Sequence, residues 1–216
     1  LAAERVLDIG CGVGRFATYF LDRGADVIGV DGDMQSLCRC AWHAAGRPGR
    51  LDLYWTSVHT LPEIAPCDLA VACEVLCYVP DVGRALRAIV ARLRPGGTLL
   101  LSVEARWGWA LSVDAPGGGL DVALAEPVGT DTGVLDLTDD RWVRIYQRDQ
   151  LHAELSAAGL RVEGIWPMLY TLDGPLESLV PSTATTAELL AIEQRCRDHP
   201  IWSPLNRVWT AAAVKA

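Results

Sequence analysis

Positive charge is scarce in this sequence. Acidic residues outnumber basic ones by 27 to 19, the formal net charge is −8, and Lys215 is the only lysine. A surface of this charge repels phosphate backbones, and the arginines are scattered along the chain instead of forming a patch. We therefore expect no nucleic-acid partner and favour a small-molecule substrate.

Long apolar runs are missing as well. No stretch approaches the ~18 apolar residues that a membrane span requires, and the first residues do not show a basic region followed by an apolar one. These two absences argue against a membrane helix and against a secretion signal. We expect no membrane partner and a cytoplasmic location.

The cysteines lack the spacing of a metal site. Cys38 and Cys40 form a C-x-C pair on an expected helix, without the paired C-x-x-C or histidine spacing of structural zinc sites. Four others lie in or beside apolar runs: Cys11, Cys67, Cys73 and Cys77. In such places a free cysteine acts as a small hydrophobic residue. We expect buried free thiols in a reducing cytosol, and no metal.

What the sequence does contain is an alternation of short apolar runs with amphipathic ones. This pattern predicts parallel strands with helices on both faces, and the length fits a single α/β domain over 1–216. Strands are expected at Arg5–Ile9, Asp26–Asp31, Leu51–Trp55, Asp68–Cys73, Thr98–Val103, Leu160–Trp166 and Arg207–Val214. Helices are expected at Gly14–Arg23, Asp33–Ala45, Asp81–Leu93 (ended by Pro95, Gly96 and Gly97), Asp149–Ala158 and Ala187–Asp198 (with Thr186 as N-cap).

Two segments fall outside this alternation, 105–143 and 167–206. Both are longer than the loops of a compact domain, and we expect these insertions to cover the substrate side. The first contains three consecutive glycines and three tryptophans: Gly117, Gly118, Gly119, Trp107, Trp109 and Trp142. The tryptophans form either an aromatic wall for a flat substrate or the small core of the insertion itself.

The first expected strand leads into a glycine-rich turn that runs from Asp8 to Gly14. Glycines let the backbone approach a ligand closely, and free N–H groups at the start of the next helix favour a negative or polar group. A dinucleotide fingerprint, G-x-G-x-x-G, would require glycine at position 15, where the chain has Arg15. The turn therefore predicts a ligand site, and its spacing weakens an NAD assignment.

An acidic residue, Asp31, ends the second expected strand. It lies near the ~20-residue offset at which a carboxylate reaches the hydroxyls of a bound ribose. The alternatives are a solvated strand end at Asp31 and a tight turn without a ligand at the glycines. Because both features follow strands at the right separation, we favour a ligand that contains a ribose.

These motifs are followed by three more in a fixed order: Cys67-Asp68-Leu69-Ala70, Glu74-Val75-Leu76 and Leu93-Arg94-Pro95-Gly96-Gly97-Thr98-Leu99. With the turn and Val30-Asp31, they make the chain resemble the class I S-adenosylmethionine (SAM) dependent methyltransferases, most closely their small-molecule branch. The resemblance covers most of 5–103 and resumes at about 144–166. It implies a Rossmann-like three-layer α/β sandwich, whose seven-stranded sheet is mostly parallel with the last strand antiparallel. It also implies methyl transfer from SAM by in-line displacement.

The resemblance assigns the cofactor residues. It implies that Asp8 helps hold the methionine amino group and that Asp31 binds the ribose. Four residues of the turn meet the methionine portion through their backbone: Gly10, Cys11, Gly12 and Gly14. The backbone of Glu74, at the end of the fourth strand, lies near the methionine portion, and a solvated strand end is its alternative.

The adenine side departs from the family pattern. In the family, the loop after the third strand touches the adenine, and Leu61-Pro62 place that loop at Ser57-Val58. Ser57 stands where an aspartate is common, and as a neutral partner it would bind the adenine amino group more weakly. Gly32 stands where a bulky apolar residue packs on the adenine, so Met34 is the candidate for that surface.

Tyr78 is the first candidate for a catalytic, substrate-facing residue, because related enzymes often carry a histidine there, facing the methyl group. Packing beneath the helix from Asp81 is an equally open interpretation. The candidates for the substrate pocket are Glu104, Trp107, Arg144 and Tyr146, with loop anchoring as their alternative. A single histidine in the adenine loop, His59, is more often a surface residue than a base.

The reaction leaves alternatives open. Orientation alone can supply ~7 to 11 kcal/mol of barrier reduction, so no nucleophilic side chain is required. A general base could add ~10² to 10⁴ in rate if the acceptor is a hydroxyl. The sequence does not name the acceptor atom, which can be oxygen, nitrogen, sulfur or carbon. Nucleic-acid and glutamine methylation are disfavoured, because Cys73-Glu74-Val75-Leu76 is not [DN]-P-P-[YFW]. A regulatory or degenerate SAM-binding protein is the second hypothesis, and an NAD-dependent oxidoreductase is the third. The oligomeric state stays open.

Overall fold

The computed structural model describes residues 4–112, 133–136, 141–172 and 174–216. The chain divides into two compact units. The first unit comprises Leu1–Leu101, His152–Gly164 and Ala211–Ala216, and the second comprises Ser102–Leu151 and Ile165–Thr210. A single domain over the whole chain remains a prediction.

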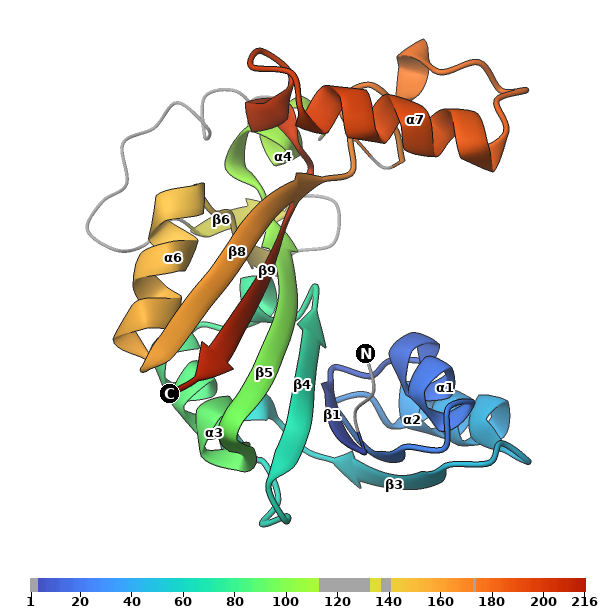
Figure 1. Ribbon diagram of the computed structural model, residues 1–216, viewed down its shortest axis with the longest axis vertical. Helices are drawn as coiled ribbons and strands as arrows, with labels where there is room; N and C mark the ends of the chain where they lie inside the picture. The colour runs from blue at the N-terminus through green and yellow to red at the C-terminus, as the bar shows by residue number, and fades with distance from the viewer. Residues whose placement is uncertain (1–3, 113–132, 137–140, 173) are drawn as a thin grey trace. The chain divides into compact units, whose positions relative to one another are not determined.

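A seven-stranded sheet has the strand order β3-β2-β1-β4-β5-β9-β8. Four strands lie wholly in the first unit: β1 (Arg5–Ile9), β2 (Asp26–Asp31), β3 (Arg50–Trp55) and β4 (Cys67–Cys73). Three others are shared along their length with the second unit: β5 (Leu93–Glu104), β8 (Leu160–Met168) and β9 (Val208–Lys215). β1 pairs in parallel with β2 and β4, and β2 pairs in parallel with β3. Figure 1 shows the arrowhead of β9 pointing opposite to that of β4. The predicted sheet is confirmed.

The helices of the first unit follow the predicted order. They are α1 (Arg15–Leu21), α2 (Met34–Ala44) and α3 (Val82–Arg92), with two 3-10 turns, η1 (Val58–Thr60) and η2 (Leu76–Tyr78). Each of the two longer helices begins after an aspartate. The carboxylate of Asp33 accepts the N–H groups of Gln35 and Ser36, and that of Asp81 accepts the N–H of Arg84. These caps satisfy N–H groups that have no partner inside a helix.

The prediction placed the end of α3 to within one residue but was wrong about where β5 begins. We expected Pro95, Gly96 and Gly97 to separate a helix ending at Leu93 from a strand beginning at Thr98, but β5 begins at Leu93, directly after α3, and includes all three residues. A Cβ at Gly97 would lie 3.0 Å from the carbonyl oxygen of Cys67. Glycine therefore lets the first part of β5 run close beside β4, where a side chain would not fit.

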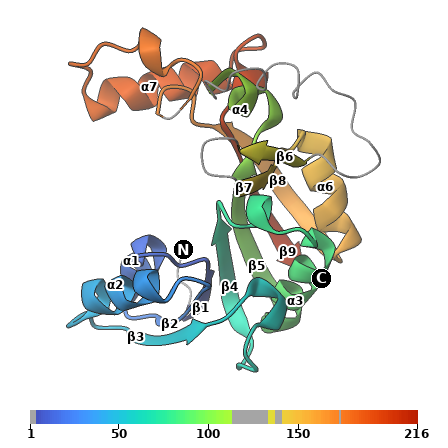
Figure 2. The same cartoon turned by 180° about the vertical axis from the view of Figure 1, so that it is seen from behind.

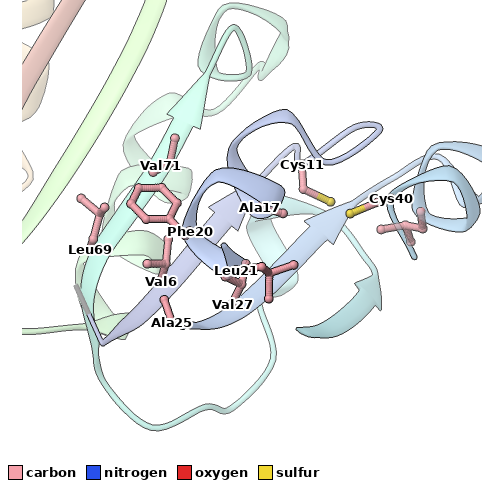
Figure 3. Close-up of a cluster of buried hydrophobic side chains, with 11 residues drawn as sticks. Val6, Cys11, Ala17, Phe20, Leu21, Ala25, Val27, Cys40, Leu69 and Val71 are labelled. Atoms are coloured by element: carbon pink, nitrogen blue, oxygen red, sulfur yellow. The ribbon is translucent and has the colours of Figure 1, made fainter. Parts of the chain in front are cut away.

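The core of the first unit joins α1 to the parallel strands. Figure 3 shows Phe20 of α1 lying among Val6 of β1 and Val71 of β4. The buried cluster consists of Val6, Cys11, Ala17, Phe20, Leu21, Ala25, Val27, Leu37, Cys40, Leu69 and Val71. Burial of these apolar side chains fixes the start of α1, and with it the turn that leads into the helix.

The second unit contains the two predicted insertions. Its elements are α4 (Arg106–Ser112), β6 (Gly133–Asp136), β7 (Arg141–Arg144), η3 (Glu177–Leu179), α7 (Thr186–Arg197) and η4 (Ser203–Leu205). α6 (Arg148–Ala157) is shared with the first unit. β6 and β7 form the antiparallel pair visible in Figure 2. The predicted glycine run at 117–119 and the side chain of Trp142 lie outside the described residues.

The N-cap of α7 is Thr185, so the prediction of Thr186 was wrong by one residue. The Thr185 hydroxyl accepts the N–H of Glu188, and the Glu188 carboxylate accepts the N–H of Thr185. Such a capping box needs Glu or Gln three residues after the cap, and only Thr185 has one.

All seven cysteines are free thiols, buried except for Cys73, which is half-buried, and Cys38, which is exposed. The exposure of Cys38 departs from the expectation of buried thiols. In the described ranges, no three His, Cys, Asp or Glu side chains gather in a way that could hold a metal ion. None of the helices described above is both long enough and apolar enough to cross a membrane.

Candidate functional site

The turn after β1 is built from glycines in left-handed backbone conformations. Gly10, Gly12 and Gly14 have φ angles of 63°, 52° and 92°. Only glycine adopts this region without strain, so the alternation of glycines is required by the path of the chain. A Cβ at Gly12 would meet no atom within 4 Å, which leaves the backbone of the turn open to a ligand.

Asp8, in β1 just before this turn, carries a buried carboxyl group. The residue is 1% exposed, and one oxygen, Oδ2, has no hydrogen-bond partner in the described residues. Burial raises the pKa of Asp8 to about 7, a hydrogen bond from the N–H of Ala17 lowers it, and the charge of Asp31 raises it further. A buried, unpartnered carboxylate favours a cationic ligand group, because an ammonium would supply the missing partner.

Asp31 joins the ends of β1 and β2. Its Oδ2 accepts the N–H of Gly12 at 2.8 Å, and its Oδ1 accepts the N–H of Asp33 at 2.8 Å. Both oxygens are thus held in one orientation, and each keeps a lone pair for a further donor. A ribose hydroxyl is a donor of the kind that this carboxylate can bind.

The turn after β4 closes in on the turn after β1. A Cβ at Gly10 would lie 2.3 Å from Cγ2 of Val75, so only glycine fits there. Glu74, just before Val75, has a φ of 55°, which is costly for a residue with a side chain. The sheet therefore brings Asp8, Asp31 and Glu74 to one edge, where the carboxyl ends of β1, β2 and β4 meet. In α/β sheets ligands bind at such an edge, where the strand order reverses.

Cys11, within the glycine turn, faces Cys40 of α2. Figure 3 shows the two sulfur atoms pointing toward each other, and both residues are buried. A hydrogen bond between the thiols raises the pKa of Cys11 and lowers that of Cys40. A Cβ at Gly14 would lie 2.8 Å from the sulfur of Cys40. The side chain of Cys11 therefore anchors the turn to α2, and its backbone is what remains for a ligand.

The residues predicted for the adenine lie after β2 and β3. Met34 is exposed on the first turn of α2, and Val58 is buried in η1. The hydroxyl oxygen of Ser57 accepts the N–H of His59 at 3.2 Å, so it caps η1. A Cβ at Gly32 would meet no atom within 4 Å. Beside Gly32 lies an aromatic residue that sequence reasoning missed, Trp55, whose indole N–H donates to the carbonyl oxygen of Gly32.

Tyr78 ends η2, and 39% of its surface is exposed. Its neighbour Cys77 is buried, so η2 turns Tyr78 outward and Cys77 inward. The exposed surface of Tyr78 is compatible with contact to a substrate. Its role in catalysis stays a prediction.

The second unit contains the four residues predicted for a substrate pocket, and it brings Glu104 and Tyr146 together. Glu104 is buried and forms an ion pair with Arg207, a partner that sequence reasoning missed. Tyr146, also buried, pairs with Ala105 through a parallel bridge and donates its N–H to the carbonyl oxygen of Glu104. Arg144 ends the neighbouring strand β7, two residues before Tyr146. Their burial indicates a structural role for Glu104 and Tyr146.

Trp107 lies on α4 and is half-buried. The guanidinium carbon of Arg106 lies 5.8 Å from the centre of its ring, within the range of a cation–π contact. Trp109, by contrast, is buried in the second unit. The residue between the two tryptophans, Gly108, has no room for a side chain. A Cβ at Gly108 would lie 2.0 Å from the carbonyl oxygen of Asn206. Trp109 thus belongs to the core of the second unit, and Trp107 is the tryptophan that keeps some exposed surface.

A family of known proteins matches most of the chain. The sequence model described as "Methyltransferase domain" matches residues 1–164. Over 157 residues the chain is 34% identical to a ubiquinone biosynthesis O-methyltransferase of Nitrobacter winogradskyi, a match that covers 70% of this chain and 58% of that protein. The chain spans about half the length of the curated relatives of this kind.

Solved structures share the fold along the whole chain. An S-adenosylmethionine dependent methyltransferase from Mesorhizobium loti has a TM-score of 0.67 at 20% identity, with 98% of this chain and 90% of that chain covered. A 1,6-didemethyltoxoflavin-N1-methyltransferase of Burkholderia thailandensis, with bound 1,6-didemethyltoxoflavin and S-adenosylhomocysteine, has a TM-score of 0.61 at 22% identity, with 99% and 71% covered. At these identities the likeness establishes the fold alone.

Proposed function

This chain belongs to the methyltransferase domain family, and on that premise we propose that it transfers a methyl group from SAM to a small-molecule acceptor. The observation that carries the proposal is the carboxyl group of Asp8. Its Oδ2 is buried without a partner, one strand away from a carboxylate, Asp31, that is oriented for hydroxyl donors. The methionine part of SAM carries an ammonium group and the nucleoside part carries ribose hydroxyls, so both carboxylates gain a matching partner.

The other cofactor residues are proposed in the same way. The backbone of Gly10, Cys11, Gly12 and Gly14 contacts the methionine portion, and Glu74 lies beside it on the neighbouring turn. This assignment is supported by the left-handed turn after β1. The turn leaves free space beside Gly12, and at Gly10 it packs against Val75, the residue after Glu74. On the adenine side the candidates are Gly32, Met34, Ser57 and Val58. Ser57 is the weakest of these, because its oxygen already accepts the N–H of His59.

When bound, SAM supplies a methyl group that its sulfonium has already activated. The chain is then required to hold the acceptor atom in line with the departing sulfur and to exclude water, and such orientation supplies ~7 to 11 kcal/mol. No dedicated nucleophile of the protein is needed. If the acceptor is a hydroxyl, Tyr78 is the first candidate to position it or to receive its proton.

Acceptor recognition is proposed for the second unit. Glu104, Trp107, Arg144 and Tyr146 stay the candidates, with Trp107 favoured because it keeps exposed surface. The relatives named above include an O-methyltransferase and an N1-methyltransferase, so they assign no single acceptor atom. We further propose a cytoplasmic location, supported by seven free thiols, which a reducing compartment maintains.

A second candidate function is a SAM-binding protein without turnover. It is supported by the two departures on the adenine side, the missing side chain at Gly32 and the capping role of Ser57. Both functions require SAM binding, and only the first requires a methylated product. An oxidoreductase would instead bind NADH at a site for which SAM does not compete.

Calorimetric titration with SAM tests the shared part of these proposals. We expect the wild-type chain to bind SAM and Asp31→Ala to bind it at least tenfold more weakly, which corresponds to ~1.4 kcal/mol or more. Unchanged affinity in Asp31→Ala would remove this residue from the site. Mass spectrometry of a metabolite extract incubated with isotopically labelled SAM then separates the two functions, because only a methyltransferase yields a labelled product.

A further inference from the structure

Trp55 is an exposed aromatic residue at the edge of the sheet where the proposed cofactor binds. It is the last residue of β3, and 66% of its surface is exposed. Single exposed apolar residues are common and need no explanation by themselves. The indole of Trp55, however, is held in place, because its Nε1–H donates to the carbonyl oxygen of Gly32 at 2.9 Å. This contact fixes the ring beside the end of β2.

The register of the sheet places Trp55 next to Asp31. The two residues are direct partners in the parallel pair of β2 and β3, and the N–H of Thr56 donates to the carbonyl oxygen of Asp31 at 3.1 Å. Partners in a parallel pair project their side chains from the same face of the sheet. The indole therefore stands beside the carboxylate proposed for the ribose. A base attached to a ribose bound at Asp31 would therefore come near Trp55.

Gly32 leaves space at this point. A Cβ there would meet no atom within 4 Å, and its φ is not among the left-handed angles, so the backbone itself does not require glycine. A flat ring can therefore approach the backbone of Gly32, where a side chain would otherwise stand. The chain after Trp55 leads directly to Ser57 and Val58, where η1 begins. The loop 55–58 thus presents one large apolar ring and one buried aliphatic side chain near the open space.

We propose that the indole of Trp55 forms the apolar wall of the adenine site and is a determinant of affinity for the nucleoside part of the cofactor. The inference rests on the proposed function, and it replaces Met34 as the main surface for the adenine. Every base has an aromatic face, and base–aromatic stacking measured by alanine substitution corresponds to about fivefold to 150-fold in affinity.

Substitutions at three positions test this assignment, with S-adenosylhomocysteine as the titrated ligand. Trp55→Ala is expected to lower the affinity at least tenfold, while Trp55→Phe, which keeps an aromatic ring and loses the N–H, retains most of it. The matched control is Trp42→Ala. Trp42 is 76% exposed on α2, about 12 Å along the helix axis from Met34, and its loss should change the affinity less than twofold. Met34→Ala measures how much Met34, the other candidate for the surface that packs on the adenine, contributes to the affinity.

A second measurement covers the case in which Trp55→Ala fails to fold. Binding of the ligand should quench tryptophan fluorescence in the wild-type chain, and the quench should shrink in Trp55→Phe but not in Trp42→Phe. An equal quench in all three would overturn the assignment. A gain of affinity on adding Gly32→Ile to Trp55→Ala would support it, since a second apolar side chain would then fill the vacated place.

The outcomes separate this inference from the proposed function. If Trp55→Ala binds as the wild type does while Asp31→Ala is weakened, the inference is wrong and the proposed function stands. A larger loss in Met34→Ala than in Trp55→Ala would also contradict the inference. If the wild-type chain binds neither SAM nor S-adenosylhomocysteine, the proposed function itself fails.

Discussion

In the first unit the candidate residues are held mainly by the backbone, whereas in the second buried side chains hold them as well. Asp31 accepts two backbone N–H groups, and the glycines of the turn owe their position to their own φ angles. Glu104 instead depends on the guanidinium of Arg207, and the indole N–H of Trp209 donates to the carbonyl oxygen of Tyr146. A site built from the backbone should tolerate substitutions of the residues around it but not of its glycines. A site built from side chains depends on single partners.

The largest effect is expected from Arg207→Met in the second unit. The substitution leaves the carboxylate of Glu104 buried without its ion-pair partner, and such losses cost about 3 to 5 kcal/mol of unfolding free energy. Chemical denaturation measures the change. Arg161→Met is the control, because Arg161 is 68% exposed in its pair with Glu163 and a surface pair contributes about 1 kcal/mol or less. Equal losses in the two variants would break the contrast between the units.

Gly10→Ala should disrupt the backbone-built site of the first unit. The new Cβ would lie 2.3 Å from Cγ2 of Val75, and the alanine would also have to adopt a φ of 63°, so the Val75 side chain or the turn must move. We expect SAM affinity to fall by about 100-fold or more, which corresponds to ~2.7 kcal/mol. Gly24→Ala shares the left-handed strain but meets no atom within 4 Å, and calorimetry should show its SAM affinity unchanged within about twofold. Similar losses in both variants would contradict the steric argument.

A smaller effect is expected where α7 is tied to the end of β8. The Oε1 atom of Glu193 accepts the N–H groups of Tyr170 and Thr171 at 2.8 and 2.7 Å, and the hydroxyl of Thr171 as well. Glu193→Gln replaces a charged acceptor with a neutral amide oxygen that still accepts, and we expect thermal unfolding to report a loss of about 1 kcal/mol. Glu188→Gln on the same helix preserves its capping box and should cost little. A greater loss in Glu188→Gln would argue against the Glu193 contacts.

The contrast between the units also explains how much could be predicted. Asp8, the three glycines and Asp31 lie within one βαβ stretch, where spacing along the chain determines position in space. The family resemblance therefore found them, and the parallel sheet confirmed their place at one edge. The start of β5 was mispredicted because the fit of Gly97 against Cys67 depends on a neighbouring strand.

Contacts between distant segments left no signal in the sequence. Nothing near Glu104 or Arg207 marks them as a pair, since the pairing arises from the meeting of two segments far apart along the chain. Trp55 was read only as the end of a strand, although its register with Asp31 follows from the order β3-β2-β1. The cap at Thr185 was recoverable, because Glu188 three residues later distinguishes it from Thr186.

The buried carboxyl group of Asp8 is the proposed partner of the ammonium group of the cofactor. Burial raises the pKa of Asp8 from 3.8 to about 7, so the folded chain binds a proton more tightly than the unfolded chain. The contribution of this group to stability is therefore lost as the pH rises from about 4 to 7. Only the ionised carboxylate pairs with an ammonium, so cofactor binding should require the loss of this proton.

Calorimetric titration of S-adenosylhomocysteine between pH 5.5 and 7.5 tests this claim most directly, with Asp8→Asn as the matched variant. We predict that the affinity of the wild-type chain rises about tenfold over this range and that the affinity of Asp8→Asn is weaker at pH 7.5 and nearly independent of pH. A wild-type affinity that does not change with pH, or a variant that binds as tightly as the wild type at pH 7.5, would contradict the account.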